Sequence, residues 1–543
     1  MSNPARFQLE VSDPSVTGLV VVSCLDAQTD FVVRTVLPNH TFEYVASTLA
    51  FAGARISRSN DSFVDIFREV NALAGKAQTR LANIFRKYGH ASVAEMAMLF
   101  VFLENIPDVY AAKLFYESSF GAGQQRSTRY QNFGNLATQP LRKYWANPNL
   151  ILAEEFLEYQ TYSDSLYQKW HARLYPALAR YFQIDESNKA QISALQARTF
   201  DTVRSFLLGG ITNRTSLAYL TQAREWAKII AIFKSENDPC LVALGEQVEF
   251  LLAPLEGTAE EVGYTPEAPD LLRYTQRDET TRTAQGKLKE WYEKYRFKIT
   301  ESGCFRPLAQ TVELVDLRFG SEKLFAQALL CVNPNLDYQA TLAYLSGLSS
   351  REKRELSPLL LGEYDCYRQL PEWLGTNSHT YVLNCSYGEY RDFNRHRVWS
   401  KFVPLLSSQD KYYTLFYGII TPLYLQVKKL KKHQAEFVTD CVDLQEKAQD
   451  LAGKLRHENE ALDYLAPQLS IFAANCQPIL SGSPKHVSYM ADRRQKPGGH
   501  INYRALAYQL AEITADFDPF LEAVRSTDPA PDPNSRDQFL DRS

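Results

Sequence analysis

The same order of secondary-structure signals occurs twice along this chain, and this repeat limits the folds that the chain can adopt. The first half has β-branched runs at 19–25 and 31–37, a helical stretch at 61–88 and a long amphipathic helix at 152–181. The second half has a β-branched run at 312–319, a helical stretch at 338–362 and a long amphipathic helix at 437–455. The order predicts a repeat of whole domains rather than a short solenoid period. Helix-rich domains can also share such an order by chance.

Composition between and after the halves predicts where domains end. Residues 253–305 combine Pro, Gly and Thr with dense charge, which is typical of a linker, and one short helix is expected at 288–295. The last residues are polar and Pro-rich. We therefore expect a first domain at 16–256 and a second domain at 310–525. A linker is expected between them at 257–309, and a disordered tail at 526–543.

Composition also excludes several classes of protein. A chain of 543 residues exceeds what one hydrophobic core usually organises, and 45% hydrophobic residues rule out wholesale disorder. The net charge of −4 gives no overall basic field, so nucleic acid is not an expected partner. Eight scattered cysteines without CxxC spacing indicate neither a zinc site nor a disulfide framework. Without a signal peptide or an apolar run of about 18 residues, we expect a cytoplasmic protein with no membrane segment.

The segment after Gly89 has the residues of a helix start. His90, Ser92 and Glu95 fall where unpaired backbone N–H groups favour anions, so this segment is a candidate edge of a phosphate or cofactor site. The alternative is that His90 and Ser92 only cap the helix while Glu95 completes a capping box. Spacing alone leaves both interpretations open.

A second polar cluster follows in the first half. Two guanidinium groups, a hydroxyl and a phenol fall within seven residues, at Gln124, Gln125, Arg126, Ser127, Arg129 and Tyr130. Such a cluster suits bidentate binding of a phosphate with a polar base nearby. A solvated surface turn would contain the same residue types.

The second half contains two basic clusters. The first consists of Arg391, Arg395, His396, Arg397 and Ser400, and the second of Arg493, Arg494, the Gly498-Gly499 turn, His500 and Arg504. Concentrated like charge costs free energy unless an anion lies among the groups, which suggests a phosphate-rich ligand. The alternatives are a solvent-facing basic patch for the first cluster and a surface loop for the second.

These motifs resemble the flavin-dependent thymidylate synthases of the ThyX type, with the family signature split between the halves. The first half keeps His90-x-Ser92-x-x-Glu95 and Ser127-x-Arg129-Tyr130 but has Glu117-Ser118-Ser119 where RHR would fall. The second keeps Arg395-His396-Arg397 with Ser400 in the RHRxxS spacing but lacks the S-x-R-Y ending. The resemblance covers most of 16–256 and 310–525.

Further matches and departures lie around these motifs. Arg204 precedes a leucine-rich strand, as an arginine does in the family. Gln222-Ala223-Arg224 corresponds to the family's N-A-R sequence on a helix. Gln125 replaces the glutamate expected before S-x-R-Y, and Asp392 replaces the glutamine expected before RHR. An acidic residue near a nucleotide phosphate would repel it.

The resemblance implies a set of ligands and roles. Family members form tetramers whose active sites hold FAD, dUMP and methylenetetrahydrofolate, while NADPH reduces the flavin. By resemblance, FAD would be held by His90, Ser92, Arg224, Arg395, His396 and Arg397. The uracil nucleotide would be held by Gln125, Ser127, Arg129, Arg204 and Arg494, with Ser127, Arg129 and Tyr130 as the catalytic groups. Ser127 is not expected to attack covalently, because no His or Lys is placed in the sequence to activate it.

The sequence therefore predicts an α+β protein and a function. We expect two repeated ThyX-like domains, each a curved antiparallel sheet with packed helices, facing each other as a pseudo-dimer, and at least a homodimer of such chains. The expected activity is FAD-dependent methylation of dUMP to dTMP with methylenetetrahydrofolate and NADPH. The alternative is a noncatalytic flavin- or nucleotide-binding scaffold that retains the fold.

Overall fold

The computed structural model describes most of both halves of the chain. The described residues are 6–11, 20–37, 46, 50, 91–134, 152–210, 214–264, 266–277, 294, 312–317, 322–332, 338–361, 378–403, 418–458, 465–526 and 528–541. The helical stretch predicted at 61–88 lies outside them, and so does the short helix predicted at 288–295 apart from Lys294.

The first half contains an antiparallel sheet. Its strands within the described residues are β1 (Phe7–Val11), β2 (Val20–Asp26), β3 (Val32–Leu37), β4 (Met98–Pro107), β5 (Ala122–Gln125) and β6 (Arg214–Gln222), in the order β1-β2-β3-β4-β6-β5. The first two predicted β-branched runs form β2 and β3, because alternate residues such as Val22 and Cys24 are buried. A bulge between Leu103 and Ile106 precedes the end of β4, and helix α5 (Asp108–Glu117) follows at once.

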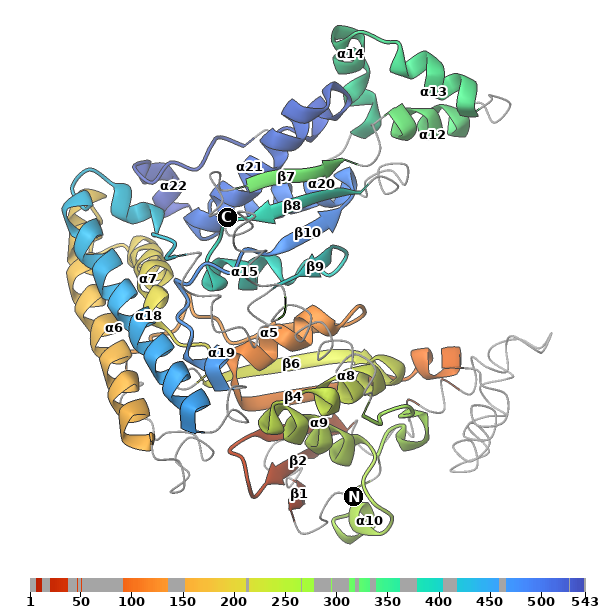
Figure 1. Ribbon diagram of the computed structural model, residues 1–543, viewed down its shortest axis with the longest axis vertical. Coiled ribbons are helices and arrows are strands. Elements are labelled where there is room, and N and C mark those ends of the chain that lie inside the picture. The colour runs from red at the N-terminus through yellow and green to blue at the C-terminus, as the bar shows by residue number, and fades with distance from the viewer. Residues whose placement is uncertain are drawn as a thin grey trace.

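The second half contains another antiparallel sheet. Its described strands are β7 (Val312–Leu317), β8 (His379–Leu383), β9 (Ser400–Phe402) and β10 (Ile479–Gly482), in the order β7-β8-β10-β9. This order matches β3-β4-β6-β5 of the first sheet, and helix α15 (Tyr387–Phe393) follows β8 as α5 follows β4. The chain is therefore an α+β protein with antiparallel sheets, and the two sheets lie in the upper and lower parts of Figure 1.

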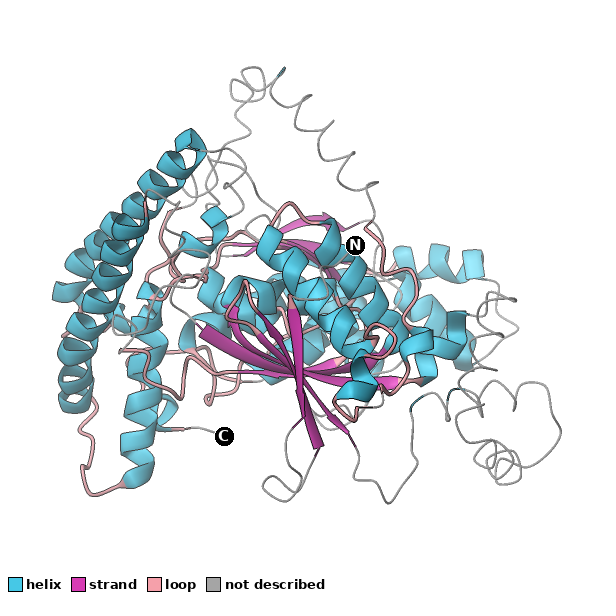
Figure 2. Cartoon of the chain, turned by 90° about the horizontal axis from the view of Figure 1, so that it is seen from below, coloured by secondary structure: helices cyan, strands magenta, loops and turns pink. Residues whose placement is uncertain are grey.

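Helices pack on both sheets. In the first half α8 (Ala223–Ser235) and α9 (Pro239–Leu252) pack together against β1, β2, β3 and β6. In the second half α20 (Pro484–Arg494) and α21 (Ile501–Phe517) pack together against β10 and β7. Figure 2 shows helices packed around the strands. No described helix has both the length and the apolar character needed to cross a membrane.

The helical stretch predicted at 338–362 is two helices. After α12 (Glu322–Val332), the chain forms α13 (Tyr338–Ser346) and α14 (Ser350–Leu361). The break occurs because Ser349 starts a new helix: the Glu352 backbone N–H donates to its hydroxyl, and its own backbone N–H donates to the Glu352 carboxylate. Both helices fall within the stretch predicted to be helical.

The two long amphipathic helices are confirmed, and they pack against each other. They are α6 (Ala153–Tyr181) and α18 (Lys431–Glu458), which lie side by side in Figure 1. The packing is antiparallel, since Lys454 of α18 pairs with Glu155 near the start of α6 while Glu436 pairs with Arg173 further along it. Trp170 of α6 is fully buried in this interface and donates to Asp440 at 2.6 Å.

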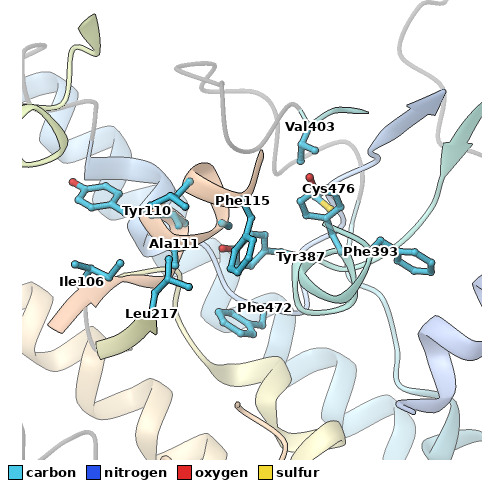
Figure 3. Packing of buried hydrophobic residues seen from close by; sticks show 14 of the residues in the cluster. Ile106, Tyr110, Ala111, Phe115, Leu217, Tyr387, Phe393, Val403, Phe472 and Cys476 are labelled. Carbon is cyan, nitrogen blue, oxygen red and sulfur yellow. The ribbon is translucent and has the colours of Figure 1, made fainter. Parts of the chain in front are cut away.

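A second contact between the halves is made by backbone. Residues 205–210, from η3 (Arg204–Phe206) onward, pair antiparallel with residues 468–473, which follow from α19 (Ala466–Leu469). The Phe472 N–H donates to Leu207 O at 2.8 Å and the Gly209 N–H to Ser470 O at 2.8 Å. Between the two sheets α5 and α15 bring Phe115 and Tyr387 into one apolar core, which Figure 3 shows from nearby.

The prediction of a disordered tail is wrong for residues 528–541. They include helix α22 (Arg536–Leu540), whose Phe539 is buried and stacks on Phe182 with ring centroids 3.8 Å apart. Buried Arg198 of α7 (Lys189–Val203) donates to the carbonyls of Phe539 and Asp541. Polar composition suggested disorder, but one aromatic side chain and one guanidinium fix this segment.

Part of the segment predicted as a linker packs against the first half. Residues after 257 form α10 (Thr258–Glu261) and η4 (Pro269–Leu271) and bury Tyr264 and Leu271 in the core. The Tyr264 hydroxyl donates to the Leu251 carbonyl at 2.8 Å. The first domain therefore continues past residue 257, because these apolar side chains pack on α9.

Candidate functional site

Polar residues of both halves meet beside the contact between α5 and α15. Four segments contribute: the loop after β5, the junction of α7 and η3, the end of α15 with the residues after it, and the loop between α20 and α21. They bring together Arg129 and Arg204 from the first half with Asp392, Arg395, Arg494 and His500 from the second. The sequence motifs are therefore neighbours across the two halves of one chain.

Arg129 is held by a buried carboxylate. Its Nε and Nη2 donate to the two oxygens of Asp201 at 2.7 and 3.1 Å, and Nη2 also donates to Gly498 O at 2.9 Å. Burial alone would raise the pKa of Asp201, but Arg129 holds that pKa below its ordinary value. The guanidinium lies over the Tyr130 ring, while the Ser127 hydroxyl accepts the Arg129 backbone N–H.

Asp392 lies among several guanidinium groups. Arg204 Nη2 is 3.5 Å from its Oδ2, and Arg494, Arg129 and Arg395 also act on its charge. Burial alone would raise the pKa of Asp392, yet these arginines lower it to about 2. Asp392 is therefore ionised.

The basic segment that follows Asp392 is less completely paired. Arg395 is half-buried and forms no hydrogen bond or ion pair with the described residues. Arg494 donates from Nε to His396 Nε2 at 2.7 Å. Burial and then Arg494 lower the pKa of His396 well below its ordinary value, so the ring is neutral and accepts. The charge of Arg397 opposes the rise that burial causes in the pKa of Tyr219 in the first half.

The side-chain amide of Gln125 is hydrogen-bonded to another buried acid. Its Nε2 donates to Asp108 Oδ1 at 2.8 Å, and Asp108 is fully buried. Arg391 forms an ion pair with the same carboxylate at 2.8 Å, and the Tyr387 hydroxyl donates to it at 2.8 Å. Burial raises the pKa of Asp108 while Arg391 opposes the rise. This network joins α5 to α15 and keeps the Gln125 amide turned towards them.

A small pocket opens beside Arg204. Its lining includes Asp201, Arg204, Glu389, Phe472 and His500. Arg204 Nη2 and both ring nitrogens of His500 are buried without a hydrogen-bond partner in the described structure. Burial and then Arg204 lower the pKa of His500 to about 3, so its imidazole is neutral. These unsatisfied atoms are the groups that a ligand or ordered water would bind.

The remaining predicted cofactor residues lie elsewhere. Arg224, at the start of α8, is exposed and forms an ion pair with Glu95 of η1 (Ala91–Met96). His90 lies outside the described residues, as does the side chain of Ser92. The predicted α-helix at this point is a 3₁₀ turn that ends where β4 begins, because alternate residues from Leu99 onward are buried as in a strand.

Sequence reasoning missed the acids that pair with the predicted arginines. Asp201 and Asp108 are both fully buried, and each neutralises an arginine far away in sequence. Asp201 could have been found as an acidic residue on the apolar face of α7, three residues before Arg204. Asp108 follows directly after a strand, which is a weaker signal.

The buried Glu389 predicts a pH dependence of stability. Burial raises its pKa to about 7, although the Ser386 backbone N–H opposes the rise. Between pH 4.5, near the ordinary value, and pH 7, the folded state binds more protons at Glu389 than the unfolded state, so this residue lowers the free energy of unfolding as pH rises. We expect Glu389→Gln to gain stability relative to the unmodified protein between pH 5 and pH 7.5 in urea unfolding. A constant difference between the two proteins would contradict this assignment.

Comparison with known proteins gives distant relatives. No protein-family model matches the chain. A UPF0159 protein of Chlamydia pneumoniae is 22% identical over 473 residues, which cover 82% of this chain and 80% of the relative. A UPF0159 protein of Chlamydia muridarum is 21% identical over 465 residues, with the same 82% and 80% coverage.

Solved structures give weaker likenesses. The UMP/dUMP methylase PolB from Streptomyces cacaoi bound with 5-Br dUMP has a TM-score of 0.26 and 15% identity, over 39% of this chain and 93% of that one. Thymidylate synthase X from Helicobacter pylori with FAD and dUMP has a TM-score of 0.23 and 14% identity, over 42% of this chain and 95% of that one. Scores this low carry no argument about the fold or activity of this chain.

Proposed function

We propose that this chain catalyses the FAD-dependent methylation of dUMP to dTMP, with methylenetetrahydrofolate as carbon donor and NADPH as reductant of the flavin. The observation that supports the proposal is the meeting of both half-signatures in one chain. Arg129 of Ser127-x-Arg129-Tyr130 and Arg395 of the RHR segment both act on Asp392. Neither half alone contains both motifs.

We further propose that the chain is a fused, degenerate duplication arranged as a pseudo-dimer. Three observations support it: the matching strand orders β3-β4-β6-β5 and β7-β8-β10-β9, the antiparallel pair of α6 and α18, and the antiparallel pairing of 205–210 with 468–473. A two-fold axis brings equivalent segments of two subunits together in this way. We expect two such chains to associate, which sedimentation would detect as a homodimer.

The charge balance at Asp392 suits a nucleotide phosphate. Four guanidinium groups, those of Arg129, Arg204, Arg395 and Arg494, lie near two carboxylates, those of Asp201 and Asp392. Arg198 also lies 3.9 Å from Asp201, so positive charge is left over at this site, which suits a phosphate monoester dianion. Arg204 is the best candidate for direct contact, because its Nη2 is buried without a hydrogen-bond partner among the described residues.

The residues after Asp392 fit an anionic cofactor in part. Arg397 lies close to Lys401, and burial and then this like charge lower the pKa of Lys401 to about 8. Lys401 donates only to oxygens of Asn394 among the described residues, so the local positive charge is not neutralised by an acid there. Arg395 and Arg397 would hold the FAD pyrophosphate, and FAD would supply the redox chemistry. His396 fits less well, because it is buried and accepts from Arg494.

A noncatalytic nucleotide- or flavin-binding scaffold is the second candidate. Two predicted substrate groups are already engaged inside the protein: Arg129 by Asp201 and Gln125 by Asp108. Substrate would have to bind without them or displace their partners. The deciding experiment combines three measurements on purified protein: flavin absorbance after loading with FAD, calorimetry with dUMP, and dTMP formation with all co-substrates. Binding without turnover supports the scaffold, and binding of neither ligand contradicts both proposals.

The proposed subsites predict separable losses. Arg494→Ala should weaken dUMP binding by about 10- to 100-fold, because one charge-assisted contact contributes about 1.5–3 kcal/mol, and should leave FAD content nearly intact. Arg397→Ala should lower FAD content and leave dUMP affinity nearly intact. Arg173→Ala on α6 is a matched control, since this half-exposed arginine pairs with Glu436 of α18 and lies over the Trp170 ring, outside the arginine cluster. Equal losses of both ligands in both variants would contradict the division.

A further inference from the structure

Asp392 occupies the position among the arginines that an anionic ligand would take. It lies in the last turn of α15, and four arginines from separate segments act on its charge: Arg204, Arg494, Arg129 and Arg395. Its side chain is only 16% exposed. The negative charge of Asp392 therefore offsets part of the positive charge of these arginines.

The contacts of Asp392 are poor compared with those of its neighbour Asp201. Asp201 accepts two hydrogen bonds from Arg129, at 2.7 and 3.1 Å. Asp392 Oδ2 and Arg204 Nη2 are 3.5 Å apart, and both atoms are buried without a hydrogen-bond partner in the described structure. Asp392 therefore attracts the guanidinium of Arg204, but it does not accept a hydrogen bond from the Nη2 of Arg204. A phosphate oxygen at ordinary distances of about 2.7–2.9 Å would satisfy that donor better.

We infer that Asp392 is an internal competitor for phosphate, which sets how tightly the arginine cluster binds a phosphorylated ligand and shifts its preference towards ligands with less negative charge. This inference rests on the proposed nucleotide site. The competition is electrostatic: a bound phosphate would lie near an ionised carboxylate and share the same guanidinium groups with it. The Asp392 carboxylate would not repel the uncharged base and sugar of a nucleotide.

The test removes the charge and keeps the shape. Asp392→Asn should raise the affinity for inorganic phosphate and for dUMP by at least about tenfold, because a like charge is removed at short range. The affinity for deoxyuridine, which lacks the phosphate, should not change. Asp392→Glu keeps the charge and should stay near the unmodified protein. Calorimetry at fixed low salt measures all three ligands.

Two further variants complete the design. Asp392→Gln introduces the residue that the family signature has at this position and serves if the asparagine variant does not fold. Asp26→Asn is the matched control, because Asp26 is a buried acid that accepts both 3.0 Å hydrogen bonds of Arg6 at the end of β2, outside the cluster. It should leave phosphate affinity unchanged.

The outcomes separate this inference from the proposed function. A folded Asp392→Asn or Asp392→Gln protein whose phosphate affinity is unchanged or lower would overturn the inference. A gain for inorganic phosphate in a protein that binds neither dUMP nor deoxyuridine would keep the inference and remove the nucleotide site. Equal gains for dUMP and deoxyuridine would also overturn it, because the effect would then not come from the phosphate.

Discussion

Arg129→Ala should lower the free energy of unfolding by about 3–5 kcal/mol, because it removes the hydrogen-bonded partner of a buried carboxylate and leaves only Arg198, at 3.9 Å, as an ion pair. Asp201 has no exposed side-chain surface and takes both of its short hydrogen bonds from Arg129. The same substitution frees the Gly498 carbonyl in the loop before α21. Urea unfolding followed by circular dichroism measures the loss.

A double variant shows whether the uncompensated charge is the cause. Arg129→Ala with Asp201→Asn should recover a large part of the loss, since the buried negative charge is then gone. Arg173→Ala on the surface of α6 should cost less than about 1 kcal/mol. If the double variant is as unstable as Arg129→Ala alone, packing rather than charge fixes this site.

Trp170→Ala should lower the free energy of unfolding by about 3–5 kcal/mol, the range found for large aromatic residues in cores. The indole is fully buried between α6 and α18 and contacts Phe437 with ring centroids 5.0 Å apart. Because these helices belong to different halves, the loss should weaken their docking. Urea unfolding gives the free energy, and hydrogen exchange of α6 and α18 shows where protection is lost.

Trp170→Phe is the informative partner of this variant. It keeps an aromatic ring but removes the N–H that donates to Asp440. Trp170→Phe should lower the free energy of unfolding by about 1–3 kcal/mol, less than Trp170→Ala, since Asp440 retains its ion pair with Lys169 at 2.5 Å. A Trp170→Ala protein as stable as the unmodified one would mean that the two halves do not depend on this helix pair.

Helices and strands were predicted correctly where the local pattern of apolar residues agrees with the side chains that are buried in the structure. The α18 stripe of Phe437, Cys441, Leu444 and Leu455 is buried as its periodicity indicated, and the β-branched runs became strands. The tail was predicted wrongly because its composition is polar, while its position depends on Phe539 and on Arg198, which is 341 residues away. Local composition carries no information about such a partner.

The same limit applies to the candidate site. The motifs identified Arg129, Arg204 and Arg395, and these lie near one another in the structure. The motifs could not show that Arg129 is bound to Asp201, because that contact joins residues 72 positions apart and depends on how α7 packs. Gln125 likewise fits its motif position, yet it donates to Asp108 at the start of α5. Residue type predicted the positive charge, and tertiary packing determined how much of it remains available.

The charges on the two long helices make their pairing directional. Lys169 and Arg173 lie on α6, while Glu436 and Asp440 lie on α18. In a symmetric dimer, each helix must carry both members of every such pair. Glu155 of α6 pairs with Lys454 of α18, so α6 carries an acid near its start and bases further along it, while α18 carries acids near its start and a base near its end. Two antiparallel copies of α6 would therefore also bring unlike charges together, so these ion pairs fix the antiparallel direction of the helix pair and do not by themselves prevent one half from joining a copy of itself.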